Sequence, residues 1–291
     1  MKKLSSIDAI VALVIIVFLM FSLLTMNIGY LALEHAEIVG SYPISKHFVS
    51  LISNWEISTI ILFHKVSWWT HIMLVLIFLN ELPYSKHFHV VMSIPNVYFS
   101  NIEHLGKMDN MPSVTKEVKL MMDPNADPYA TPAADAPPPE SFGAKDVTDL
   151  NWVQLMNAYS CTECGRCTSE CPANQTGKLL SPRKIMMDTR QRLKEVGKNI
   201  DKHGKDYTDN KSLLNDYITP EELWACTTCN ACTEACPLNI DPLSIIMDLR
   251  RYLVMEQSAA PQELNMMFTN VENNGAPWQF PAADRLKWKD E

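Results

Sequence analysis

The sequence has no clustered basic face, no phosphate-binding glycine loop and no cysteine in its first hundred residues. Its formal net charge is −8, with 33 acidic residues against 25 basic ones. Nucleic-acid binding needs a concentrated basic surface, so this charge balance argues against a nucleic-acid partner. Neither a G-x-G-x-x-G nor a Walker sequence is present, so the usual nucleotide-binding motifs are missing as well.

The eight cysteines form two short groups in the second half of the chain, each reading C-x2-C-x2-C-x3-C-P. The groups are Cys161, Cys164, Cys167 and Cys171 before Pro172, and Cys226, Cys229, Cys232 and Cys236 before Pro237. Disulfide frameworks spread their cysteines along the chain, and zinc sites usually separate their C-x2-C pairs by a dozen or more residues. The spacing therefore predicts two [4Fe–4S] clusters and leaves no cysteine as a nucleophile.

The ligand sets are expected to cross between the groups. Three cysteines at intervals of three wrap one face of a cubane, and the fourth reaches the other cluster. One cluster is then held by Cys161, Cys164, Cys167 and Cys236. The other is held by Cys226, Cys229, Cys232 and Cys171.

Residues 7–33 form a long apolar stretch in which only Asp8 is charged. A transmembrane helix needs about 20 such residues, so the stretch predicts a first span. A signal peptide is the alternative, because Lys2 and Lys3 give a basic start. We disfavour it, since its apolar region would be shorter and would end in a small-x-small cleavage site.

A second apolar region, 57–94, predicts a second span whose borders are open. One choice is 57–80. We favour the other, about 66–92, which puts Trp68 and Trp69 in the aromatic belt and allows a kink at Pro83. Residues 48–63 then form an interfacial approach segment.

The basic residues predict the orientation of the two spans. Lys2 and Lys3 precede the first span, and Lys86 and Lys107 follow the second, whereas the connecting loop has Lys46 as its main cation. The positive-inside rule then places both termini in the cytoplasm, with the chain in the inner membrane. A reducing compartment also suits free metal-binding thiols.

We expect an all-α protein in four parts, because no segment has a clear strand pattern. The parts are a membrane domain at 1–100, a proline-rich linker at 101–148, a helical cluster-binding domain at 149–260 and a tail at 261–291. Helix starts are predicted at Ser181-Pro182, at the capping box Thr219–Glu222 and at Asp241-Pro242.

The two cysteine motifs, separated by the charged insertion 173–225, resemble the α-helical ferredoxin domain. That domain occurs in iron–sulfur subunits of succinate dehydrogenase, anaerobic glycerol-3-phosphate dehydrogenase, glycolate oxidase and heterodisulfide reductase. The resemblance implies that the clusters form a wire between a redox site and a membrane acceptor.

The membrane region holds four histidines: His64, His71, His87 and His89. Histidines within a span are costly and are candidates for function. His89 follows His71 by 18 residues, about five turns or about 27 Å along one straight helix, so the two would share a face. His87 would point away, and we take it for an ordinary polar residue.

The segment from His71 to Pro95 resembles the last helix of the membrane cytochrome b subunit of respiratory nitrate reductase, including its Pro-aromatic-Ser-basic run. The resemblance implies that His71 and His89 are candidate ligands of haem b. Residues 7–33 resemble the preceding helix but contain no histidine, and His35 lies at its exit. The opposite axial ligands are then expected from another membrane subunit or from a longer natural protein, and the remaining alternative is that the haems have been lost.

The combination resembles membrane-bound heterodisulfide-reductase-like proteins, which usually add a catalytic domain with CCG motifs. No CCG occurs here, so the resemblance implies a catalytic partner subunit, namely a CCG-domain protein. The favoured function is electron transfer between the quinone pool and that partner, through haem b and the clusters. A redox sensor or assembly scaffold is the alternative, and a self-contained enzyme is disfavoured. The tail aromatics, Trp278, Phe280 and Trp288, would either dock the partner or cover the core.

Overall fold

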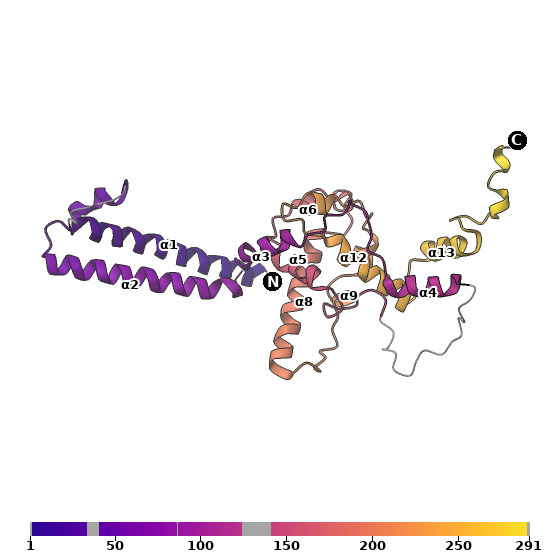
Figure 1. Ribbon diagram of the computed structural model, residues 1–291, viewed down its shortest axis with the longest axis horizontal. Coiled ribbons are helices and arrows are strands. Elements are labelled where there is room, and N and C mark those ends of the chain that lie inside the picture. Colours follow the sequence, from indigo (N-terminus) through magenta and orange to yellow (C-terminus); the bar gives the residue numbers. More distant parts are fainter. Residues whose placement is uncertain (1, 34–40, 86, 124–140, 290–291) are drawn as a thin grey trace. The chain divides into compact units, whose positions relative to one another are not determined.

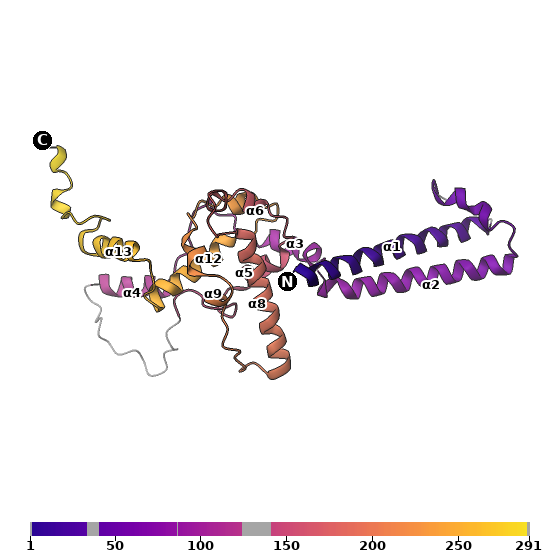
Figure 2. The same cartoon turned by 180° about the vertical axis from the view of Figure 1, so that it is seen from behind.

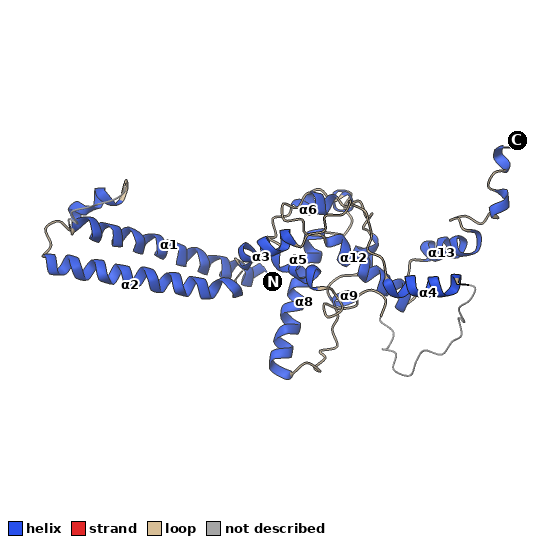
Figure 3. Cartoon of the chain, in the orientation of Figure 1, coloured by secondary structure: helices blue, strands red, loops and turns tan. Residues whose placement is uncertain are grey.

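The computed structural model describes residues 2–33, 41–85, 87–123 and 141–289. In these ranges the regular elements are all helices and no strand forms (Figures 1 and 3), apart from one isolated bridge between Leu214 and Ile218. The chain divides into two compact units, Met1–Ile94 and Pro95–Glu291. The all-α prediction is confirmed.

The first unit is a hairpin of two long helices, α1 (Lys2–Ala32) and α2 (Ile57–Glu81), which lie side by side in both views (Figures 1 and 2). A 3₁₀ helix, Ser45–Leu51, lies in the connection between them. The two helices approach closely at Gly29, where an added Cβ would stand 3.0 Å from the Cβ of His64. Glycine at this position therefore permits the close packing of α1 and α2.

Both helices of the hairpin are long and apolar enough to cross a membrane. The candidate spans are Ile10–Ala32, of 23 residues and mean hydropathy 2.6, and Ile57–Tyr84, of 28 residues and mean hydropathy 1.6. At 1.5 Å per residue, 23 residues cover about 35 Å, more than the hydrocarbon core of about 30 Å. Only 11% of each span is buried inside the protein, so their apolar side chains face outward, unlike those of a core helix.

The second helix differs from our favoured borders. It begins at Ile57 and ends at Glu81, so the range 66–92 is wrong and the alternative 57–80 is close to the observed helix. Lys65 does not delay the helix, because its aliphatic stem can carry the ammonium group to the interface. At the other end Pro83 lacks an N–H group, and the chain passes through a short 3₁₀ turn, Leu82–Tyr84. The supposed approach segment 48–63 is divided between the 3₁₀ helix and α2.

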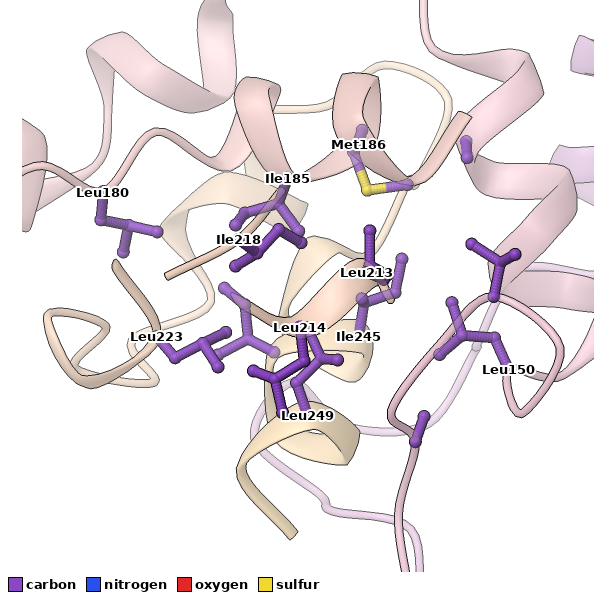
Figure 4. Close-up of a cluster of buried hydrophobic side chains, with 14 of the residues drawn as sticks. Leu150, Leu180, Ile185, Met186, Leu213, Leu214, Ile218, Leu223, Ile245 and Leu249 are labelled. Atoms are coloured by element: carbon purple, nitrogen blue, oxygen red, sulfur yellow. The ribbon is translucent and has the colours of Figure 1, made fainter. Parts of the chain in front are cut away.

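The second unit is built around α5 (Trp152–Ser160), α8 (Pro182–His203) and α12 (Pro242–Arg251). Helix α8 packs against both of the others. Figure 4 shows the apolar core between them, to which the segment 213–223 also contributes. Its fully buried side chains include Leu180, Ile185, Met186, Leu213, Leu214, Ile218, Leu223, Ile245, Ile246 and Leu249.

The three predicted helix starts are confirmed. The side chains of Ser181 and Asp241 accept backbone N–H groups at the starts of α8 and α12. Thr219 and Glu222 form the complete capping box of α10 (Pro220–Trp224). Each start thus satisfies N–H groups that lack a partner within the helix.

The domain border predicted at 149 lies too late in the chain. Ala144 and Val147 are each 1% exposed and belong to the core. Asp146 accepts hydrogen bonds from the buried guanidinium of Arg192 on α8, which also pairs with Asp209. The last residues of the predicted linker are therefore part of the folded unit. The proline-rich stretch 124–140 itself lies outside the described residues.

The remaining helices are short or peripheral. They are α3 (Phe88–Tyr98), α4 (Pro112–Met122), α6 (Arg166–Ser169), α7 (Pro172–Gln175), α9 (Leu213–Asp216), α11 (Ala231–Glu234) and α13 (Gln262–Asn274), with a π-helical turn at Tyr252–Glu256 and 3₁₀ turns at Ala282–Asp284 and Lys287–Lys289. In the tail, Trp278, Phe280 and Trp288 are 50%, 68% and 74% exposed, so they do not cover the core.

We predict that Gly143→Ala destabilises the second unit more than Gly177→Ala. Both glycines have positive φ, 76° and 81°, which costs an alanine about 1–2 kcal/mol. At Gly143 a Cβ would also stand 2.3 Å from the Asp248 carbonyl oxygen, whereas at Gly177 nothing lies within 4 Å. We expect Gly143→Ala to cost about 2–4 kcal/mol. Thermal unfolding of the full chain in detergent, monitored by circular dichroism, checks this. Equal melting temperatures of the two variants would contradict the prediction.

Candidate iron–sulfur site

The first cysteine motif follows directly on the end of α5. Cys161 caps that helix in an extended conformation, and the chain then curls through two residues of positive φ, Glu163 at 59° and Gly165 at 86°. Cys167 lies on the short helix α6, and Cys171 precedes Pro172 at the start of α7. The two left-handed residues flank Cys164, so the loop turns tightly around the position of its second cysteine.

The second motif repeats this backbone conformation. Thr228 and Asn230 have φ of 56° and 59° and flank Cys229 in the same way. Cys232 lies on α11, and α11 packs against α6 of the first motif. Left-handed backbone is uncommon for residues other than glycine, so its recurrence at matching positions marks a shared requirement of the two loops.

The curled backbone directs hydrogen-bond donors at sulfur. The N–H of Thr228 donates to Sγ of Cys226 over 3.4 Å, and the N–H of Glu163 stands in the same relation to Cys161. These bonds stabilise a thiolate more than a thiol. A ring of N–H donors around thiolates is one of the ways in which a protein adjusts an iron–sulfur cluster.

The eight thiols are all free and are unequally exposed. Cys161, Cys171 and Cys232 are buried, Cys164 and Cys229 are exposed, and the others are intermediate. The second cysteine of each motif is thus the outermost one. Any group held by a motif would have its edge at the protein surface there.

The thiols of the two motifs lie near one another. The pKa of Cys161 is raised to about 11, chiefly by burial, and neighbouring Cys167 and Cys236 contribute to the rise. Burial likewise raises the pKa of Cys226, with an additional contribution from Cys171. The fourth cysteine of each motif is therefore close enough to the other motif to repel its thiolates, as the crossed ligand sets require.

The raised thiol pKa values have a chemical consequence. The pKa of Cys232 is raised most, to about 12, chiefly by burial and further by the neighbouring negative groups, so these thiols would hold their protons without a cation nearby. Iron binds the thiolate and supplies the missing positive charge. Two sets of converging thiols with N–H donors fit iron–sulfur clusters. In the described part of the chain, no three His, Cys, Asp or Glu side chains surround a single metal-ion position.

The helices that follow each motif hold the loops in the same way. Thr168, after Cys167, bonds to the capping side chain of Ser181, and Thr233, after Cys232, bonds to the capping side chain of Asp241. Each loop is thereby tied to the start of the long helix behind it. The same threonine hydroxyls also bond to the preceding cysteine sulfur.

The sequence carries a signal for this arrangement beyond the cysteines. The helices α8 and α12 share the pattern P-x-x-I-x-M-D-x-R, starting at Pro182 and Pro242. Its final arginines, Arg190 and Arg250, both donate to the carbonyl of the first cysteine of a motif. Our sequence reasoning used only the capping residues and missed these arginines, which comparison of the two halves would have found.

The membrane histidines are placed differently from expectation. The helix break at Pro83 puts His71 on α2 and His89 on α3, so they do not share one straight helix. Nδ1 of His71 lies 3.0 Å from Oγ of Ser22 on α1, and Nδ1 of His64 lies 3.1 Å from the Met26 carbonyl oxygen. His71 and His64 therefore face α1, as their spacing of seven residues predicts. His35 lies outside the described residues.

His87 is less ordinary than expected. Its Nδ1 is buried without a hydrogen-bond partner in the described part of the chain. Its ring stacks on that of His89 with centroids 6.3 Å apart. The two histidines thus lie together at the start of α3 rather than on opposite sides of a helix.

Comparison with known proteins agrees with this site. The 4Fe-4S dicluster domain matches residues 160–240, which contain both motifs. The chain is 32% identical over 86% of its length to a probable iron-sulfur-binding oxidoreductase, FadF, of Bacillus subtilis. It is 30% identical over 86% of its length to the EtfAB:quinone oxidoreductase of Syntrophomonas wolfei. These matches cover only 37% and 34% of the two relatives, so the chain spans about a third of their length.

A third relative is shorter. It is one subunit of the ferredoxin/F(420)H(2)-dependent CoB-CoM heterodisulfide reductase of Methanosarcina acetivorans, 33% identical over 41% of this chain and 60% of its own length. No solved structure matches the chain. The chain is therefore an iron–sulfur protein with a 4Fe-4S dicluster domain, and it resembles the iron–sulfur subunits of heterodisulfide reductases.

Proposed function

We propose that this chain is a membrane-anchored electron-transfer subunit that relays single electrons between the quinone pool and a catalytic partner. One observation carries the proposal. Two cysteine loops of the same conformation each bring one cysteine, Cys164 or Cys229, to the surface, while their other cysteines are buried or half-buried. When bound, a cluster supplies one-electron transfer, and an edge at the surface allows exchange with another protein.

Two [4Fe–4S] clusters with crossed ligands are part of this proposal. The set Cys161, Cys164, Cys167 and Cys236 holds one, and the set Cys226, Cys229, Cys232 and Cys171 holds the other. The proximity of Cys236 to Cys161, and of Cys171 to Cys226, supports the crossing. The alternative, in which each motif fills its own cluster, would give the fourth cysteines no reason to approach the opposite motif.

The partners and location follow from the same features. The two apolar helices support an anchor in the inner membrane, crossing twice, with both termini and the cluster-binding unit in the cytoplasm. A relative named as an EtfAB:quinone oxidoreductase supports the quinone pool as one redox partner. A relative named as one subunit of a heterodisulfide reductase supports a separate catalytic partner, for which a CCG-domain protein is our choice.

Haem b on His71 is the finer part of the proposal. The contact with Ser22 fixes the ring of His71 through Nδ1 and would leave Nε2 free to bind iron, as is usual for metal-binding histidines. Helix α1 has no histidine at the corresponding depth, so the second ligand would come from another membrane subunit or from further helices of a longer natural protein. His89 remains a candidate ligand of a second haem, although it lies beyond the helix break.

The crossed ligand sets predict which cluster is damaged when each cysteine is replaced by serine. Cys164→Ser and Cys229→Ser identify the paramagnetic resonance signals of the first-motif and second-motif clusters in the reduced protein. Cys171→Ser should then weaken the same signal as Cys229→Ser, and Cys236→Ser the same signal as Cys164→Ser. If Cys171→Ser weakened the Cys164→Ser signal instead, each motif would fill its own cluster and the assignment would be wrong.

A second prediction concerns electron exchange in membranes that contain the chain and its native neighbours. Clusters reduced in advance, with the reductant removed, should be reoxidised by a water-soluble quinone analogue within the turnover time of the complex. Resonance signals at successive times measure this. Signals that stay reduced, while a chemical oxidant removes them at once, would favour a scaffold with structural clusters.

A third prediction concerns haem. The reduced-minus-oxidised visible spectrum of such membranes should contain a sharp α-band of the b type. His71→Ala should remove it, and His47→Ala should not, because His47 is an exposed residue of the 3₁₀ helix between the spans. A spectrum that shows only the broad bleaching of iron–sulfur clusters would rule out haem b in the assembly.

A further inference from the structure

Two arginines occupy matching places behind the two cysteine motifs. Arg190 on α8 and Arg250 on α12 each stand nine positions after the capping residue of their helix. Nη1 of Arg190 donates to the carbonyl oxygen of Cys161 over 3.0 Å. Nη2 of Arg250 donates to the carbonyl oxygen of Cys226 over 2.6 Å. Each guanidinium therefore lies against the first cysteine of its own motif.

The aromatic residue two positions before that cysteine is also matched. The guanidinium of Arg250 lies 4.9 Å from the ring centroid of Trp224, and Arg190 interacts electrostatically with Tyr159. Arg250 donates in addition to the carbonyl of Leu223. Carbonyls and a ring hold the guanidinium in place without neutralising its charge.

Among the described residues, no carboxylate lies within ion-pair distance of Arg250 to compensate its charge. Burial lowers its pKa, and the negative charge of Cys226 opposes that effect. An arginine nevertheless stays protonated. The structure thus holds a half-buried positive charge beside Cys226, a proposed cluster ligand.

The charge of Arg190 is compensated in part. Its guanidinium forms an ion pair with Glu163, which lies two residues after Cys161. The second motif has Thr228 at the corresponding position. The two halves therefore share the arginine and its contact with the cysteine carbonyl, but differ in this one carboxylate.

A cluster that takes up one electron gains one unit of negative charge, and no bond forms or breaks. A cation beside its ligands stabilises the reduced state more than the oxidised state, and strongly so where water is excluded. We propose that Arg190 and Arg250 each raise the reduction potential of the cluster held by their own motif, and that Glu163 weakens this effect in the first motif. The inference rests on the proposed clusters.

Other charges near the ligands limit what the proposal covers. Exposed Arg166 acts on Cys164, and the capping carboxylate of Asp241 acts on Cys232. They contribute to the absolute potentials, but substitutions of the two arginines, Glu163 or Thr228 leave them in place. The proposal is therefore about the shift at each cluster, and does not rank the two clusters.

The test is a redox titration of the full chain with its clusters, monitored by paramagnetic resonance. The Cys164→Ser and Cys229→Ser variants assign the two signals. Arg250→Gln should lower the potential of the second-motif cluster only. We expect a change of about tenfold in the reduced-to-oxidised ratio at fixed potential, which is about 59 mV for one electron. Arg250→Lys keeps the charge and should retain most of the potential. Arg190→Gln should give a smaller shift, confined to the first-motif cluster.

The differing carboxylate provides matched variants that leave both arginines in place. Glu163→Gln should raise the potential of the first-motif cluster, and Thr228→Glu should lower that of the second. If both clusters are present by iron content and neither variant moves its potential, the proposal is overturned. It is also overturned if Arg250→Lys shifts the potential as far as Arg250→Gln, since the arginine would then act only through its hydrogen bonds.

Failure of the proposed function would look different. A wild-type chain without two separately titrating signals, or with clusters that never exchange electrons with quinone, would remove the electron-transfer role whatever these variants do. Two titrating clusters with unchanged potentials would leave that role intact and remove only the role of the arginines.

Discussion

The folded unit depends on holding several buried thiols close together, where burial and the repulsion between neighbouring thiolates both oppose ionisation. Burial raises the pKa values of Cys161 and Cys232 to about 11 and about 12, so the thiolate form must be stabilised by iron and by directed N–H groups. Hydrogen bonds from α8 and α12 to the cysteine loops fix where those groups point. The apolar core between α8 and α12 keeps the two helices, and with them the two cysteine loops, in fixed positions relative to each other.

The repeat of the two halves explains how so long an insertion is accommodated. Each half consists of a helix, a cysteine loop, a short helix and a capped long helix that bonds back to the loop. Arg192 lies two residues beyond the repeated pattern on α8. It makes the two halves different by binding Asp146 and Asp209. Those contacts fasten the segments before and after α8 to it. The insertion between the motifs is therefore scaffold for the loops and not a separate domain.

The hairpin of α1 and α2 is stabilised differently from the cluster-binding unit, because it has little apolar core of its own. Its apolar side chains face outward, and the contact between α1 and α2 is limited to a narrow strip with Gly29 at the closest approach. The polar groups on that strip satisfy one another, as Ser22 does for His71. A hairpin with so little internal core is suited to pack against lipid or further helices, which agrees with the proposed role as an anchor within a larger complex.

The sequence by itself determined the helical class, the two long apolar segments, the capped helix starts at Ser181, Thr219 and Asp241, and the two cysteine motifs. These are local features, set by side chains close together along the chain. It misjudged the start and end of the second long apolar helix and the domain border at 149. The errors in the borders of that helix come from Lys65 and Pro83, because the effect of either residue on a helix depends on the groups around it.

Only the tertiary structure decided which distant groups meet. Asp146 joins the core through Arg192, Glu163 pairs with Arg190, and Arg250 reaches Cys226. Each pair is separated by more than twenty residues, so no local pattern specifies it. Folding brings these groups together because a guanidinium that is removed from water must find hydrogen-bond acceptors, and the carboxylates and the cysteine-loop carbonyl supply them.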